Sequence, residues 1–334
     1  MDLFRAVEAV ESEAASERRR ASRIALARLF VRISGDTEVL NNYPKLRESL
    51  PSAERYISSF HYRSAAEEAL DDVPLWLHLQ FHADSITALL RRAGAPYWQV
   101  NRPAVLLWLA TQEDGQRQLA SAENAPQHYA LLQRAAAARG LPLISPLLDL
   151  DEISQLSADQ VWQLSVEPVL ALAPRYDADA VLVGKLAQRY DKRWLGQWLL
   201  LYQGRQQLLH YEGEQVEEYF ALGVNLVADR LARDYAVVAT DRQHSAELKL
   251  TVEAVDSQRD YVALRDYLAK ISAVEALQLV RLDGDRCDFY FQSSSDLAKI
   301  RSLLELDKRL LWLGRPGVGG LHYRWRGEHF SDNP

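Results

Sequence analysis

Residues 173–186, APRYDADAVLVGKL, begin the stretch of sequence that decides the fold of this chain. Residues 180–186 are apolar at nearly every position, which is typical of a central strand covered on both faces. Two further strands are predicted over 193–202 and 206–212, and Gly204 supplies the turn that joins them into a hairpin. This pattern indicates an architecture but names no reaction.

A long amphipathic helix follows the hairpin. Its apolar side chains recur at helical spacing and form one stripe: Val216, Phe220, Val224, Val227, Leu231 and Tyr235. Upstream, the strand 103–110, a helix over 128–139 ended by Gly140 and the strand 141–148 follow the β-α-β rhythm of a parallel pair. With shorter helical pieces over 151–163 and 166–173, residues 102–240 are predicted to form an α/β domain.

The residues before this domain predict a small α+β domain over 1–98. A strand over 3–10 leads into a helix that Ser16 caps and Gly35 ends. A shorter helix is predicted over 46–56, and strands over 57–63 and 73–81 come after it. Asp84 is expected to cap one more helix, which stops at Gly94.

The last segment, 245–334, has the clearest alternation of apolar and polar residues along its predicted strands. A strand over 248–254 precedes a helix capped by Ser257 or Asp256, and strands over 277–282 and 287–292 flank a turn. A helix over 295–306 and a strand over 309–314 complete a β-α-β-β-α-β order, which is the ferredoxin-like pattern. We therefore predict an α+β and α/β protein of three small layered domains. The ferredoxin-like order hosts many functions, so it indicates none.

Composition narrows the class of protein. The 334 residues are 48% hydrophobic and carry a net charge of -7, which opposes nucleic-acid binding because phosphate needs a basic surface. The Arg-rich run over 18–23 is the exception. Its nearby glutamates favour a solvated helix face, and an anionic lipid or polymer site is the alternative. No apolar run approaches the length of a membrane span.

A family resemblance covers nearly the whole chain. It rests on FVRISGD at 30–36, LQFHADSITALLRRAGAPYW at 79–98, GLPLISPLLDLDE at 140–152, YDADAVLVGKL at 176–186 and VADRLARDYAV at 227–237. These motifs resemble the proteobacterial family called domain of unknown function 2066. The middle domain is also similar to the amino-terminal domain of TolB, to FlgT and to lipoprotein activators of peptidoglycan synthases. The second resemblance implies a module that binds partners without doing chemistry.

The compartment follows from this resemblance. Members of the family typically carry an export signal, and none precedes Asp2 here. The alternatives are a cytosolic protein and an exported one whose signal peptide has been removed, and the resemblance implies the periplasm. The single Cys287 cannot form an intramolecular disulfide, and its alternation with Phe289 and Phe291 predicts a buried packing residue.

Catalytic and metal-binding candidates have simpler structural interpretations. His78 and His82 form an H-x-x-x-H pair, but on a strand they would lie about 13 Å apart at ~3.3 Å per residue, too far to share one metal. The acidic cluster over 149–152 lies where carboxylates cap a helix. The glycine-rich segment 314–320 lacks the Lys and Ser or Thr of a phosphate loop. No serine lies in a G-x-S-x-G motif.

The aromatic residues are the candidate partner-binding residues. Trp194, Trp198 and Tyr202 share one face of a predicted strand, which either lies under helices or forms an exposed patch for a partner. Covering by helices is the favoured interpretation. Trp76 and His78 are expected to point outward from their strand, where a partner could contact them.

We therefore expect a non-enzymatic periplasmic binding or scaffold protein that recognises an envelope protein or polymer. It is expected to need no cofactor and no metal. The alternative is a hydrolase or transferase acting on an envelope polymer, with acids such as Asp149 or Asp177 at a domain junction.

Overall fold

A computed structural model describes residues 2–64, 75–113, 115–238, 246–314 and 320–327. Over these residues the fold is mixed α+β, with eleven α-helices, two 3-10 helices and four sheets. The chain divides into two compact units, 102–231 and the flanking 2–101 with 232–334. The predicted junction over 240–245 lies outside the described residues, and the three-domain layout stays a prediction.

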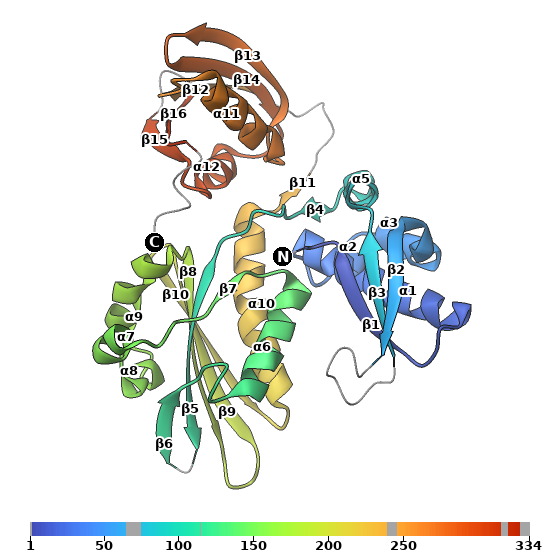
Figure 1. Cartoon of the computed structure of the whole chain (residues 1–334), viewed down its shortest axis with the longest axis vertical. Coiled ribbons are helices and arrows are strands. Elements are labelled where there is room, and N and C mark those ends of the chain that lie inside the picture. Colours follow the sequence, from blue (N-terminus) through green and yellow to red (C-terminus); the bar gives the residue numbers. More distant parts are fainter. Residues whose placement is uncertain (1, 65–74, 114, 239–245, 315–319, 328–334) are drawn as a thin grey trace. The chain divides into compact units, whose positions relative to one another are not determined.

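The unit 102–231 is built on a six-stranded sheet (Figure 1). Its strands are β5 (Val105–Glu113), β6 (Gln116–Leu119), β7 (Leu143–Ile144), β8 (Ala180–Gln188), β9 (Trp194–Tyr202) and β10 (Arg205–Gly213). The order is β10-β9-β8-β5-β6, with β7 pairing β5. β5 runs parallel to β8 and β7, whereas the hairpin of β9 and β10 and the short β6 are antiparallel.

One sequence-based strand in this unit is much shorter than expected. Only Leu143–Ile144 of the segment 141–148 pair with the sheet. Pro142 and Pro146 flank that pair, and proline has no N–H to donate to a ladder. The rest of the segment therefore runs as a connection into the next helix.

Helices cover both faces of this sheet (Figure 1). They are α6 (Pro126–Arg139) and α10 (Val216–Tyr235) on one side, and α7 (Leu150–Gln155), α8 (Ala158–Trp162) and α9 (Val166–Leu172) on the other. A 3-10 helix over Ala173–Tyr176 connects α9 to β8. Residues of α8 and α9 share one buried cluster with Val181 and Val183. Because side chains alternate along a strand, these two valines point to the face of β8 opposite the one that faces α10.

Residues 2–101 form a three-stranded antiparallel sheet packed with helices. The order is β1-β3-β2, and the elements are β1 (Arg5–Val10), α1 (Ala15–Ser34), α2 (Val39–Asn42), α3 (Pro44–Ser49), a 3-10 helix (Leu50–Tyr56), β2 (Ile57–Ser64), β3 (Leu75–Phe81) and α5 (Ala83–Ala93). Gly35 and Gly94 end α1 and α5 in the left-handed conformation, as predicted. β4 (Pro96–Tyr97) pairs with β11 (Val237–Val238).

Two predicted caps in this sheet-and-helix layer are wrong. The N-cap position of α1 is Ala14 and that of α5 is His82, and neither side chain accepts a capping hydrogen bond. Each helix begins earlier than Ser16 and Asp84 would require. Asp84 instead lies in the first turn of α5, where a carboxylate still interacts favourably with the free N–H groups.

The last sheet has five strands because the tail strand joins it. Its elements are β12 (Ala246–Glu253), α11 (Gln258–Lys270), β13 (Glu275–Asp283), β14 (Arg286–Ser293), α12 (Leu297–Glu305), β15 (Leu310–Gly314) and β16 (Gly320–Trp325). The order is β13-β14-β12-β16-β15, and β16 runs parallel to β12. Ser257 caps α11 as predicted, by accepting from the Asp260 N–H at 3.1 Å.

Candidate functional site

A pocket that combines mostly apolar walls with a few polar side chains lies on the face of the central sheet beyond the end of the α7–α9 layer. It measures about 590 Å³ and its lining includes Gln112 of β5, Lys185 of β8, Gln197 of β9, His210 of β10 and Trp162 at the end of α8. We call it the Lys185 pocket. It forms because the helix layer covers Val181 and Val183 but stops at Trp162, so the next outward position of β8 stays accessible.

Lys185 is the central charge of this pocket. Its Nζ lies 5.7 Å from the centre of the Trp162 ring, within cation–π range. Burial and, after it, the charge of Arg117 lower the pKa of the Lys185 ammonium. No carboxylate among the described residues forms an ion pair with Lys185. Over the described part of the chain, the pocket thus holds a half-buried cation that no carboxylate neutralises.

The rim of the Lys185 pocket is polar, and its other charges are paired. Arg117 stacks over the same Trp162 ring at 4.9 Å and pairs with Asp159 at 2.8 Å. Across the pocket, the Gln197 amide lies 2.7 Å from His210 Nδ1. Glu212 pairs with Arg193 at 3.2 Å. Lys185 is therefore the charge that an incoming anion would meet.

This arrangement can hold one carboxylate beside an apolar group. An ammonium donor, side-chain amides and an aromatic wall are the groups that fix a carboxylate-bearing ligand in a mostly preformed pocket. The volume of about 590 Å³ is in the range of small-ligand sites, roughly 300–1,000 Å³.

Two of the three aromatic residues predicted from the hairpin are buried. Trp198 is fully buried and Tyr202 is buried, which corrects the exposed-patch alternative for both. The helix α10 covers them: the Trp198 indole N–H donates to the Tyr219 carbonyl at 2.8 Å, and the two rings stack at 4.6 Å. Trp194 is half-buried against His128, at 5.5 Å between ring centres.

Trp76 and His78 lie on the expected face of β3, opposite Leu77 and Leu79. His78 is buried, however, because its ring stacks at 4.7 Å on the ring of His61 from β2. His78 is therefore less exposed than predicted and Trp76 is half-buried, and contact of either residue with a partner stays a prediction. No group of three or more metal-ligating side chains occurs in the part of the chain that the structure describes.

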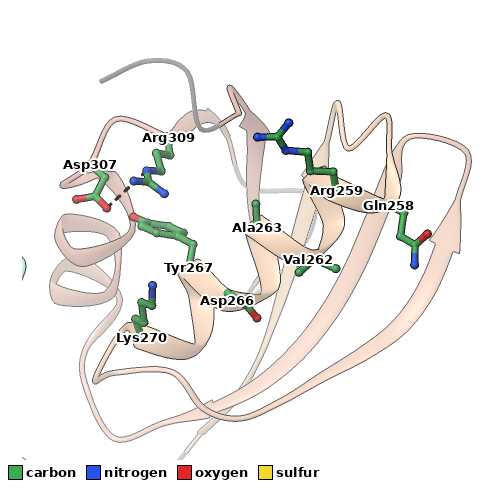
Figure 2. Close-up of a pocket in the computed structure, with 9 residues that line it drawn as sticks. All are labelled: Gln258, Arg259, Val262, Ala263, Asp266, Tyr267, Lys270, Asp307 and Arg309. Atoms are coloured by element: carbon green, nitrogen blue, oxygen red, sulfur yellow. Dashed lines mark ion pairs between the residues drawn. The ribbon is translucent and has the colours of Figure 1, made fainter. Parts of the chain in front are cut away.

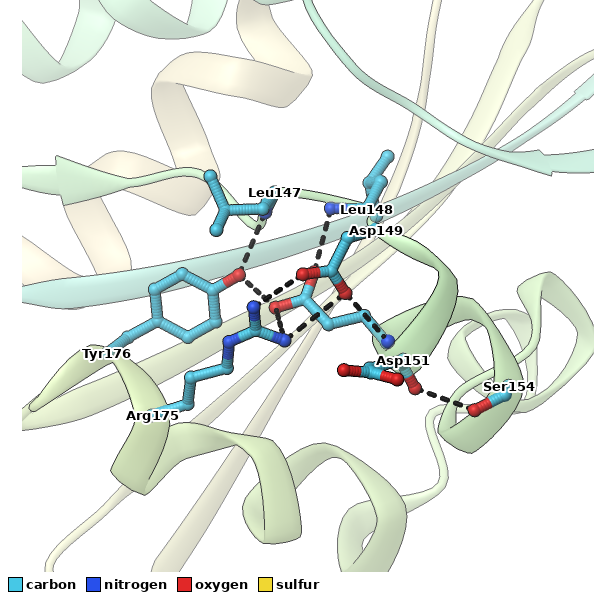
Figure 3. Close-up of polar contacts among 8 residues, drawn as sticks. Leu147, Leu148, Asp149, Asp151, Ser154, Arg175 and Tyr176 are labelled. Carbon is cyan, nitrogen blue, oxygen red and sulfur yellow. Dashed lines mark hydrogen bonds and ion pairs between the residues drawn. The ribbon is translucent and has the colours of Figure 1, made fainter. Parts of the chain in front are cut away.

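The acidic cluster after β7 is a structural network (Figure 3). Asp149 caps α7 by accepting from the Glu152 N–H at 3.0 Å, as the sequence predicts, and it pairs with Arg175. Glu152 is fully buried and accepts hydrogen bonds from the Leu148 N–H at 2.7 Å and from the Tyr176 hydroxyl. Arg175 lowers the pKa of Asp149, and burial beside Glu152 raises that of Tyr176 to about 12.

A second hollow of about 610 Å³ lies along α11 (Figure 2). Its polar groups are largely engaged within the protein. Arg309 lies 3.9 Å from Asp307 and over the Tyr267 ring, and the Tyr267 hydroxyl donates to the Leu304 carbonyl at 2.9 Å. Among the described residues that line it, this hollow lacks the half-buried, unpaired cation that marks the Lys185 pocket.

The remaining predicted features serve the fold. In the Arg-rich run, Arg18 pairs with Glu54 and Arg20 with Glu17, as on a solvated helix face. Cys287 is buried, as its alternation predicted. No helix over the described ranges combines the length and the apolar composition that crossing a membrane requires.

Comparisons with known proteins correct the family resemblance. A family model described as "Domain of unknown function (DUF8605)" matches residues 1–99. The resemblance to domain of unknown function 2066 is therefore wrong, and nothing supports modules like those of TolB or FlgT.

The other comparisons add little. The comparison with curated proteins found no match. Ten chains of solved structures match. One of them, "Crystal structure of uncharacterized protein", is 17% identical, with 41% of this chain and 95% of that chain covered and a TM-score of 0.19.

Sequence reasoning did not find the Lys185 pocket, although one signal was present. Lys185 is the only charged residue in the buried strand 180–186. A charge inside such a run indicates either a neutralising partner or an opening in the helix layer that covers the strand. Which of these holds depends on where α8 ends, and the sequence does not show that.

Proposed function

We propose that the chain is a non-catalytic recognition protein and that its Lys185 pocket binds a carboxylate group of its ligand. The observation that carries the proposal is the half-buried Lys185 ammonium, which meets the Trp162 ring and no carboxylate among the described residues. A bound carboxylate would supply the missing counter-charge. The attraction between this carboxylate and the Lys185 ammonium would be screened less than at an open surface, because the sheet and Trp162 exclude part of the water.

The ligand is an envelope protein or polymer, which would present a carboxylate on a peptide end or side chain. The periplasmic location is part of this proposal, but the family resemblance that implied it has been overturned. Fractionation of cells that make the native protein tests it separately, and recovery from the cytosol would exclude it. The proposal also keeps the three-domain layout and a ferredoxin-like last domain extended by β16.

An enzymatic alternative would use the acids after β7. A general acid needs a raised pKa, but the pair with Arg175 lowers the pKa of Asp149. Its carboxylate also caps α7. These contacts favour a structural role, and chemistry that Asp149→Ala abolishes would restore the hydrolase or transferase alternative.

The matched probes are N-acetyl-dialanine and its carboxamide, titrated into the full chain by calorimetry. We expect the acid to bind and the amide to bind at least tenfold more weakly. Lys185→Met should remove the difference between the probes, whereas Lys185→Arg should keep part of it. Lys45→Met removes an exposed lysine and serves as the charge-matched control.

The pH dependence of binding gives a second readout. Because the pKa of Lys185 is lowered, its ammonium loses the proton at a lower pH than an ordinary lysine does. Affinity for the acid should therefore fall as the pH rises, beginning below the ordinary lysine range near pH 10.5. Equal binding of acid and amide, or wild-type binding by Lys185→Met, would contradict the proposal.

A further inference from the structure

The strand β10 is a long, regular edge of the central sheet. All nine of its residues pair one-to-one with β9, from Arg205 opposite Tyr202 to Gly213 opposite Trp194, without a bulge. It is the first strand in the sheet order, so β9 is its one neighbour in that sheet. An edge of this kind presents backbone N–H and C=O groups that can pair with another strand.

The other described edge strands are protected against strand addition. The Leu3 carbonyl, just before β1, and the Arg5 carbonyl, at its start, accept hydrogen bonds from Arg32, and the Ala9 carbonyl accepts one from Arg20. β2, β13 and β15 each contain a register shift, β6 has only four residues, and β4 and β11 have two residues each. Bulges, short length and side-chain capping are the usual means of blocking edge pairing. Within the described ranges, β10 has no bulge and no side chain that caps its free edge, and it is nine residues long.

The side chains of β10 suit a strand partner better than bare solvent. Leu208 is 50% exposed on the face of the sheet that carries Leu199, past the helix layer. Leu209 is half-buried on the opposite face. Charged residues occur only at the two ends of β10, as Arg205 and Glu212, so its centre carries no charge that would oppose pairing.

We propose that β10 pairs antiparallel with β10 of a second copy of this chain, on a twofold axis at Leu209. In an antiparallel pair, opposed side chains lie on the same face of the sheet. A twofold axis perpendicular to the sheet leaves every residue on its own face, so the numbers of two opposed residues must add to an even sum. Centring on Leu209 is the choice that overlaps all nine residues. The proposed dimer does not depend on ligand binding in the Lys185 pocket.

This register is free of charge conflict. It sets Leu209 against itself, Leu208 against His210, and Gln206 against Glu212. Leu208 of each copy then lies diagonally across from Leu208 of the other, so the exposed leucines cover each other on one face. Neither Arg205 nor Glu212 faces a like charge. The two sheets would continue across the axis as one.

Disulfide trapping tests the register directly. In a Cys287→Ser background, Leu209→Cys places two thiols opposite each other at about 4.5–5.5 Å between Cα atoms, within disulfide range. Gln207→Cys is the matched control on the same strand and face, because its two copies would lie about 13 Å apart along the strands at ~3.3 Å per residue. Under mild oxidation we expect a covalent dimer from Leu209→Cys and at least tenfold less from Gln207→Cys.

Sedimentation equilibrium of the unmodified chain gives the independent measurement. The wild type should show concentration-dependent dimers, and Leu208→Lys should weaken dimerisation at least tenfold, because it sets two like charges beside the axis. Leu208 is exposed, so the variant should keep its circular dichroism and melting temperature. A monomeric wild type at all concentrations, or equal trapping of both cysteine variants, would overturn the proposal.

Discussion

At the residue scale, Trp198 and Lys185 show that the helices covering a strand decide whether its side chain becomes part of the core or stays accessible. The two residues pair at neighbouring positions of β9 and β8 but point to opposite faces, since Trp198 is opposite Gly184. Trp198 meets α10 and becomes core, whereas Lys185 lies past the end of α8 and stays accessible. Sequence pattern predicted that Trp198 shares a face with Trp194 and Tyr202. It could not place the end of the helix on the other face.

We expect Trp198→Ala to lower the free energy of unfolding by about 3–5 kcal/mol, the usual cost of truncating a buried aromatic side chain. The change removes a fully buried indole, its stacking on Tyr219 and its hydrogen bond to the Tyr219 carbonyl. Urea unfolding followed by circular dichroism measures it. Tyr190→Ala, at a side chain 94% exposed, is the control and should change stability by less than about 0.5 kcal/mol. A similar loss in both variants would contradict a core role for Trp198.

At the scale of elements, two glycines let α10 lie close to the sheet. A Cβ at Gly223 of α10 would lie 2.4 Å from Trp198 Cε2, and one at Gly184 of β8 would lie 2.3 Å from Trp198 Cζ3. The indole therefore fills the space that both glycines leave. Helical spacing places Gly223 on the apolar stripe of the helix, where the missing side chain permits a close approach. The partner in that approach was not readable, because it depends on the pairing of β8 with β9.

This packing predicts strong coupling between Gly223 and Trp198. Gly223→Ala alone should destabilise the chain by about 1–3 kcal/mol through overpacking, although alanine is the better helix former. In the Trp198→Ala background the clash is absent, so the same change should be neutral or stabilising by up to about 1 kcal/mol. A double-mutant cycle of unfolding free energies measures the coupling. Additive effects of the two substitutions would show that Gly223 does not serve the close contact.

Elements with strong local signals were predictable, and those set by tertiary context were not. The glycines that end α1, α5 and α6 were identified because a left-handed C-cap favours glycine. The N-caps at Ser16 and Asp84 were wrong because the helices begin earlier, and no local pattern decides that. The insertion of β16 beside β12 was also missed, since a parallel pairing between distant segments leaves no local signature.

At the scale of the whole molecule, residues 246–314 and 320–327 share one compact unit with 2–101, and we expect them to fold as a separate piece within it. They hold a five-stranded sheet, the helices α11 and α12, and a set of buried apolar side chains. Its most buried side chains include Leu250, Phe289, Phe291, Leu303 and Tyr323, each no more than 1% exposed. A domain of this kind is expected to be joined to the rest by a segment that few contacts cross.

We therefore expect limited trypsin digestion of the full chain to cut near Arg242 and release the last ~90 residues as a folded fragment, because folded domains resist cleavage and exposed connections do not. Mass spectrometry identifies the cut, and the purified fragment should show a cooperative thermal transition by circular dichroism. Phe289→Ala in the full chain is the control: loss of a buried ring should make the fragment itself degrade. A fragment that is unfolded on its own would show that residues 246–327 depend on the rest of the chain, and the three-domain layout would then be wrong.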